Sequence, residues 1–126
     1  MSDQRPPMWI GHVHMPVNDV VAAKQFLLDL GMRDVSPKGR DDFAILEMRA
    51  GTHVIVESAE VPVEPGTAAD FDLMVEDVEA THAALAAKGL SPSELSPGSI
   101  HTTFTIAEPG GVVIKYFSSH NSGEPV

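Results

Sequence analysis

Two segments of the chain carry apolar residues at helical spacing. In the first, Ala23, Phe26 and Leu27 recur at intervals of three and four residues, which predicts an amphipathic helix over 20–30. The second, over 78–88, is rich in alanine and has a similar apolar stripe. An aspartate stands directly before each segment and a glycine directly after it. Since aspartate caps helix N-termini and glycine ends helices, both pairs of helix boundaries are predicted as well.

Elsewhere apolar and polar residues alternate, as they do in strands with one buried face. One alternating run precedes each helix and three follow it, separated by turns that contain proline or glycine. The runs after the first helix are 33–35, 43–48 and 53–58, and those after the second are 93–95, 101–107 and 112–117. The order β-α-β-β-β therefore occurs twice.

The two halves of the chain also match at a constant offset of 58 positions, which pairs Val17 with Val75 and Asp19 with Asp77. A repeat of this length indicates two copies of one supersecondary unit. We expect a single α+β domain over 8–118, composed of two βαβββ modules. The modules are 8–60 and 68–118, the proline-rich linker is 61–67, and 119–126 is expected to be a flexible tail.

In each predicted strand the residues opposite the apolar set are largely polar. His12 and His14 stand two apart on one strand, so both side chains project from the same face, about 6 to 7 Å apart. Such a face is either the wetted side of a sheet or the wall of a cleft. Aspartate and lysine are depleted in strands, so their presence favours a ligand-binding cleft. Its predicted residues are His12, His14, His53, Glu57, Asp70, Asp72, His101, Thr103, Lys115 and Phe117.

Composition narrows the classes of function. The chain has 126 residues, 43% of them hydrophobic, and no cysteine, which suits one soluble domain without disulfides or thiolate metal sites. A net charge of -10 repels phosphate backbones, so nucleic-acid binding is not expected. The apolar runs are too short to cross a membrane, and the polar, proline-rich start does not resemble a signal peptide. We therefore expect a cytoplasmic protein that binds neither nucleic acid nor membrane.

Several short motifs resemble those of the glyoxalase, bleomycin-resistance and dioxygenase superfamily, also called the vicinal oxygen chelate fold. They are 12–20 followed by Phe26 and 30–32, then 75–78 followed by 88–90, and the turn 108–111 before 112–116. The resemblance covers about residues 8 to 118. It implies that each module is a curved mixed sheet with one helix on its outer face. It also implies a homodimer with ligand clefts between modules.

Metal-containing members of that superfamily hold a divalent ion at four strand positions. The resemblance carries these positions to His12, Ile55, Asp70 and Lys115. Only His12 is a standard match, and neither isoleucine nor a protonated lysine ligates a metal. A set of His12, Glu57 and Asp70, completed by water around Fe, Mn, Ni or Zn, remains one hypothesis. The other is that Lys115 supplies the positive charge in place of a metal, with Asp70 as its partner.

These alternatives lead to two functions. The favoured one is a small-molecule binding protein for a polar or cationic ligand, without a cofactor and without the metal site standard in the superfamily. The alternative is an enzyme, either a glyoxalase-like lyase or isomerase or an extradiol-type, ring-cleaving dioxygenase. That enzyme would use a metal on His12, Glu57 and Asp70 to polarise vicinal oxygens. A regulatory module is a third class, with no sequence feature in its favour beyond the tail.

Overall fold

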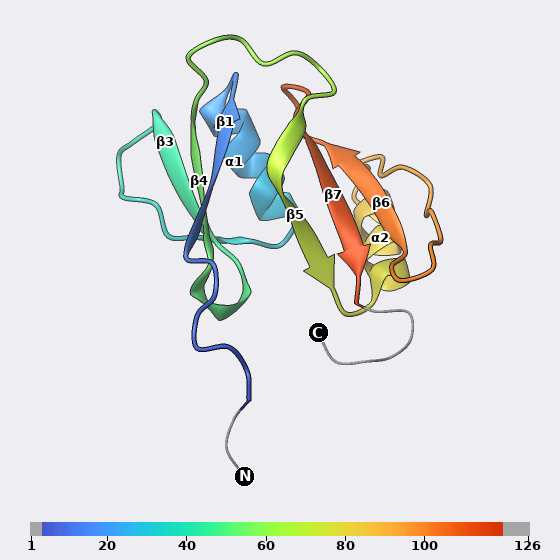
Figure 1. The fold of residues 1–126 in the computed structure, drawn as a ribbon. Helices are drawn as coiled ribbons and strands as arrows, with labels where there is room; N and C mark the ends of the chain where they lie inside the picture. The colour runs from blue at the N-terminus through green and yellow to red at the C-terminus, as the bar shows by residue number, and fades with distance from the viewer. Residues whose placement is uncertain (1–3, 120–126) are drawn as a thin grey trace.

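Two small sheets lie side by side, and one helix lies behind each of them (Figure 1). This arrangement comes from a computed structural model that describes residues 4–119. The predicted tail falls outside the described residues except for Ser119. No helix within 4–119 is long and apolar enough to cross a membrane.

The first module contains a four-stranded mixed sheet in the order β1-β4-β3-β2. Strand β1 runs parallel to β4, and the β4–β3 and β3–β2 pairs are antiparallel. The elements are β1 (His12–Val17), α1 (Val20–Asp29), β2 (Arg33–Asp34), β3 (Phe43–Glu47), the short 3₁₀ helix η1 (Arg49–Gly51) and β4 (His53–Ser58). The predicted order of elements is confirmed in this module.

The second module has a three-stranded mixed sheet in the order β5-β7-β6, with β5 parallel to β7 and β6 antiparallel to it. Its elements are β5 (Ala68–Val75), α2 (Val78–Ala87), β6 (Thr103–Ala107) and β7 (Val113–Ser118). The α+β class, the mixed sheets and the helix on one face of each sheet are as predicted.

The strand predicted over 93–95 is wrong. The backbone N–H of Ser93 donates to the Thr105 carbonyl (2.8 Å), but the Thr105 N–H donates to the Ser93 side-chain hydroxyl (2.8 Å). Only one isolated bridge, between Ser96 and Thr103, resembles a ladder. Pro92 and Pro97 flank the segment and have no N–H to donate. The segment therefore lies beside β6 without becoming a regular strand.

Both helices begin and end as the sequence predicts. The carboxylates of Asp19 and Asp77 accept hydrogen bonds from the backbone N–H three residues later, at 3.1 and 2.9 Å. Gly31 and Gly89, which follow the helices, have φ angles of 107° and 77°. Only glycine adopts these angles without strain, and each glycine ends its helix by turning the backbone directly after the C-cap residue.

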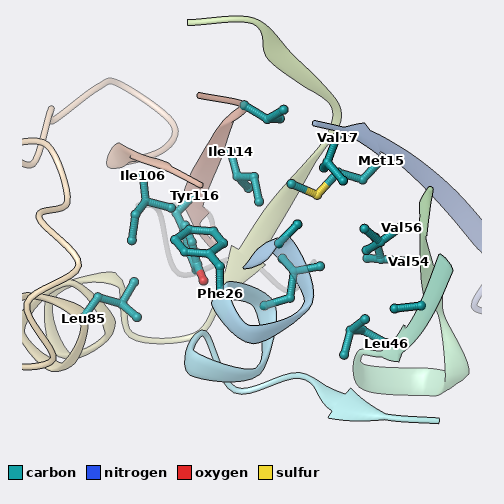
Figure 2. Close-up of a cluster of buried hydrophobic side chains, with 14 of the residues drawn as sticks. Met15, Val17, Phe26, Leu46, Val54, Val56, Leu85, Ile106, Ile114 and Tyr116 are labelled. Atoms are coloured by element: carbon teal, nitrogen blue, oxygen red, sulfur yellow. The ribbon is translucent and has the colours of Figure 1, made fainter. Parts of the chain in front are cut away.

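One continuous apolar core joins the two modules. Figure 2 shows α1 between the side chains of the first sheet, such as Val54, and those of the second, such as Ile114. The alternate residues predicted to face the helices are buried, for example Met15 at 1% exposure and Tyr116 at 3%. The two helices therefore cover one side of both sheets, and the polar residues lie on the other side.

Asn18 fixes the linker that arches from β4 to β5 (Figure 1). Its Nδ2 donates to the Val63 carbonyl (2.9 Å) and to the Gly110 carbonyl (3.4 Å), and its Oδ1 accepts from the Val63 N–H (2.7 Å). Nearby, the Gly66 N–H donates to the Gly111 carbonyl (2.8 Å). The linker is thus tied to the turn before β7, and this tie sets where β5 begins.

Candidate functional site

The ten predicted site residues lie on the face away from the helices, but they fall into two groups. Those of the first module are His12, His14, His53 and Glu57, on β1 and β4. Those of the second are Asp70, Asp72, Thr103, Lys115 and Phe117, on β5, β6 and β7, with His101 just before β6. In Figure 1 both helices lie on the same side of the two sheets, so the faces without a helix are on the same side in both modules.

A cleft of about 380 Å³ lies on this face of the second module. Four of the ten predicted residues line it, and Thr105 and Phe71 are also part of its wall. We call it the strand cleft and define it by Asp70, Asp72, Thr105, Lys115 and Phe117. Its volume is within the range of small-molecule sites, which is roughly 300–1,000 Å³.

Strand register decides which charges meet in the strand cleft. Lys115 on β7 lies between Asp72 on β5 and Thr105 on β6. The predicted partner, Asp70, lies two residues further back, where the pairing of β5 with β7 is irregular. Asp72 is therefore the aspartate in register with Lys115, and both carboxylates reach the cleft.

The ammonium group of Lys115 is open to a ligand. Within 4–119 it forms no ion pair with either aspartate, and its Nζ lies 5.4 Å from the ring centroid of Phe117. A cation over an aromatic face gains about 0.5–1 kcal/mol at an exposed site. The cleft thus presents two carboxylate acceptors, one ammonium donor and one aromatic ring to whatever enters it.

His101 and Thr103 support the aromatic wall. The His101 ring packs edge-on against Phe117 with centroids 5.3 Å apart, and its Nδ1 donates to the Ser118 carbonyl at 2.8 Å. Thr103 is the register neighbour of Phe117 on β6. Neither residue lines the cleft. Thr105, which does line the cleft, was not among the predicted residues. It follows Thr103 by two positions on the same face of β6, and that spacing could have identified it from the sequence.

The first-module residues form a separate polar row. The rings of His12 and His53 are 5.6 Å apart and tilted by 32°, since the two residues are register neighbours. His53 Nε2 lies 3.6 Å from Glu47 Oε2, and His14 Nδ1 lies 3.0 Å from Glu57 Oε1. His14 and Glu57 are about half exposed, so their interaction is screened and contributes little to stability.

The residues of the metal hypothesis do not fit one ligand shell. Glu57 is the register neighbour of Pro16, four residues along the strand from His53, the neighbour of His12. That spacing is about 13 Å at the usual strand rise. Asp70 lines the strand cleft, and it also lines two hollows beside β1, one with Val13 and one with Met15. Within 4–119 no three histidine, aspartate or glutamate side chains are grouped to hold a metal ion.

No family model and no curated protein sequence matches the chain. Solved structures do match it over nearly its whole length. TnmS3, an antibiotic binding protein from Streptomyces sp. CB03234, aligns with a TM-score of 0.73 and 19% identity, over 92% of this chain and 99% of its own. A lactoylglutathione lyase from Agrobacterium tumefaciens aligns with a TM-score of 0.74 and 15% identity, over 95% and 100%. A glyoxalase/bleomycin resistance protein/dioxygenase from Alicyclobacillus acidocaldarius gives 0.71 and 14%, over 94% and 97%.

The chain has the glyoxalase/bleomycin resistance/dioxygenase fold. The sequence resemblance is thereby confirmed at the level of the fold. Structures with this fold include an antibiotic binding protein and a lyase, so the fold alone does not select one activity.

Proposed function

We propose that this protein binds a small polar or cationic organic molecule in the strand cleft. The observation that carries the proposal is the convergence of Asp70, Asp72 and Phe117 around Lys115, whose ammonium has no ion pair within 4–119. The carboxylates would accept hydrogen bonds from an amine or guanidine of the ligand. The ammonium would donate to a carbonyl, and the phenyl ring would cover a flat or apolar part.

Charge supports a cationic ligand over an anionic one. The strand cleft holds two carboxylates against one ammonium, and the whole chain has a net charge of -10. A surface whose charges are mostly of one sign raises the local concentration of ligands of the opposite charge. Because charge is screened beyond about 8 Å at physiological ionic strength, the two aspartates in the cleft matter more than distant acidic residues.

A binding role fits the site better than metal-dependent catalysis. The alternative, a lyase, isomerase or dioxygenase, needs His12, Glu57 and Asp70 around one divalent ion. The strand register places Glu57 four residues along the strand from the neighbour of His12. The name of TnmS3 as an antibiotic binding protein supports the same choice. A cytoplasmic location stays a prediction from the sequence.

We include a homodimer in the proposal. Three consecutive apolar residues before β1 are strongly exposed, namely Met8 (70%), Trp9 (70%) and Ile10 (64%). Contiguous exposed apolar surface is typical of protein contacts, and a second copy would cover it. Trp9 is the only tryptophan, so its fluorescence should shift to shorter wavelength as protein concentration rises. Sedimentation equilibrium of the wild type and Trp9→Ser tests the same contact, and identical monomer masses for both would exclude it.

Ligand binding is tested by calorimetric titration with phenylethylamine and, as a probe of opposite charge, phenylacetate. We expect Asp72→Asn to weaken phenylethylamine about tenfold, because a charge-assisted hydrogen bond is lost. Lys115→Met should leave the amine as tight or tighter. Asp41→Asn, an exposed aspartate of the first module, is the matched charge control. Equal losses for Asp72→Asn and Asp41→Asn would contradict the proposal.

The metal alternative has its own measurement. Elemental analysis of protein purified without chelator should find no stoichiometric Fe, Mn, Ni or Zn if binding depends on the organic cleft alone. One such ion per chain, lost in His12→Ala, would favour the enzyme instead.

A further inference from the structure

A second hollow, of about 480 Å³, lies where the two modules meet. We call it the seam groove. It is formed by the end of α1, the β3–η1 junction, β5 and β7, and its main lining residues are Met32, Met48, Arg49, Leu73, Met74 and Tyr116. An adjoining hollow of about 440 Å³ shares four of these residues and extends along the seam toward Ile10. It also reaches Asp70 and Asp72 of the strand cleft. No residue that lines the seam groove also lines the strand cleft.

Tyr116 gives the groove a polar group without a partner. Only 3% of the residue's surface is exposed, and its ring stacks on that of Phe104 with the centroids 4.7 Å apart. Within 4–119 its hydroxyl makes no hydrogen bond. Among the described residues, every buried side-chain nitrogen or oxygen atom has a hydrogen-bond partner. Because the Tyr116 hydroxyl has none among them, its oxygen is not fully buried and is accessible from the groove that Tyr116 lines. Burial raises the pKa of Tyr116 to about 12, which keeps it a neutral hydrogen-bond donor.

Three methionines from distant parts of the sequence supply the apolar walls. Met32 follows α1, Met48 precedes η1 and Met74 lies on β5, where it is 49% exposed. Methionine side chains are flexible and polarisable, so surfaces built from them adapt to varied apolar ligands. An exposed methionine beside a hydroxyl that opens to the groove without a protein partner within 4–119 favours a site that a ligand completes.

The charges at the mouth favour an anion. Arg33 and Arg49 line the groove with side chains 73% and 81% exposed, whereas Glu47 is only 25% exposed and is already paired with Arg33 and His53. Arg49 is bound to Glu76 at 3.1 Å, and both side chains are 81% exposed. An exposed pair of this kind is weak, so the Arg49 guanidinium is able to turn to a carboxylate, which it binds in bidentate geometry.

We propose that the seam groove is a second binding site, for an apolar organic acid. The hydrocarbon body lies against Met48, Leu73 and Met74, and the carboxylate meets Arg49 and Arg33 at the mouth. An acceptor atom at the inner end pairs with the Tyr116 hydroxyl. The seam groove shares no lining residue with the strand cleft, and it takes ligands of the opposite charge.

Anilinonaphthalene sulfonate, a fluorescent apolar anion, is the first probe. Its fluorescence should rise with protein and saturate, and decanoate should then displace it. Decylammonium, which has the same chain length and the opposite charge, should displace it about tenfold less well. Equal displacement by both at the same concentration would show that the arginines at the mouth play no part, and it would overturn the proposal.

Variants locate the probe. Arg49→Glu and Met74→Asp should each weaken the sulfonate about tenfold or more. Arg40→Glu makes the same change in net charge at an arginine outside the groove, where the guanidinium pairs with Asp42, and should change affinity less than twofold. Lys115→Met, in the strand cleft, should also leave it unchanged. Equal losses in Arg40→Glu and Arg49→Glu would show a net-charge effect and contradict the proposed site.

Tyr116 supplies a readout specific to the groove, because it is the only tyrosine of the chain. Protein labelled at the ring carbon that bears the hydroxyl gives a single tyrosine signal in magnetic resonance. We expect this signal to move with decanoate along the same saturation curve as the fluorescence. Tyr116→Phe should fold normally, because no protein hydrogen bond is lost, and should bind decanoate as well as the wild type does, because the inner end of decanoate has no acceptor. A saturating fluorescence change with an unmoved tyrosine signal would place the probe elsewhere and overturn the proposal.

Discussion

Replacing Gly111 by alanine should destabilise the contact between the linker and the second module. Gly111 lies in the turn before β7 with φ of 99°, a value that L-residues rarely adopt. A Cβ at this position would lie 2.6 Å from the Pro65 Cα and 3.3 Å from the Pro65 N. Both are backbone atoms, so no side-chain rotation relieves the clash. The substitution must displace the linker, whose Gly66 N–H donates to the Gly111 carbonyl.

Two terms set the magnitude. The left-handed backbone costs about 1–2 kcal/mol for a non-glycine residue, and overpacking against a fixed neighbour costs roughly 1–3 kcal/mol. Alanine also lowers the conformational entropy of the unfolded chain, which favours folding and reduces this loss of stability by about 0.4–1 kcal/mol. We therefore expect Gly111→Ala to lower the free energy of unfolding by about 1–4.5 kcal/mol, with a central value of about 3 kcal/mol.

Gly39→Ala is the matched control. Gly39 also has a positive φ, 77°, but nothing lies within 4 Å of its added Cβ. Gly39→Ala therefore has the unfavourable backbone conformation without a steric clash, and it should lower the free energy of unfolding by about 1 kcal/mol. Urea unfolding followed by far-ultraviolet circular dichroism gives both free energies. If the two variants differ by less than about 0.5 kcal/mol, the linker does not press on Gly111 and the reasoning fails.

Two further predictions concern the same scaffold. Asn18→Ala removes the hydrogen bonds that tie the linker to the module ends and should cost about 1–2 kcal/mol. Asn18→Asp keeps the acceptor for the Val63 N–H and should cost less, and equal urea midpoints for all three proteins would refute this role. Hydrogen bonds from Ser36 and Lys24 lower the pKa of Asp34 from 3.8 to about 2. A depressed carboxyl pKa stabilises the fold above the unfolded value and loses that contribution as pH falls. The stability advantage of the wild type over Asp34→Asn should therefore shrink between about pH 4 and pH 2, and an advantage that stays constant across that range would contradict it.

Local features of the sequence predicted the elements well. The caps at Asp19 and Asp77 and the stops at Gly31 and Gly89 depend on hydrogen bonds and dihedral angles of adjacent residues. The buried faces followed from alternation, because a strand side chain has only two sides to point to. The segment over 93–95 shows the limit: it alternates like a strand, but the Ser93 hydroxyl replaces a backbone carbonyl in its bonding to β6.

The candidate site was predicted less completely, because register is not visible along one strand. The sequence placed Asp70, Asp72 and Lys115 on one face, and the structure brings all three to the strand cleft. It paired Lys115 with Asp70, whereas the register irregularity in β5 puts Asp72 beside the lysine. It grouped Glu57 with His12, whereas the parallel β1–β4 pairing places His53 there.

The sequence by itself determined the two modules, the helix boundaries and the face of each strand that is buried. All of these follow from periodicity and from contacts within a few residues. Tertiary structure alone decided which polar residues share a cleft and that Met32, Met48 and Met74 line one groove with Tyr116. The physical reason is that strand pairing and module packing depend on the total apolar surface that both modules bury in their shared core. That sum joins residues far apart in the chain, and no local pattern records it.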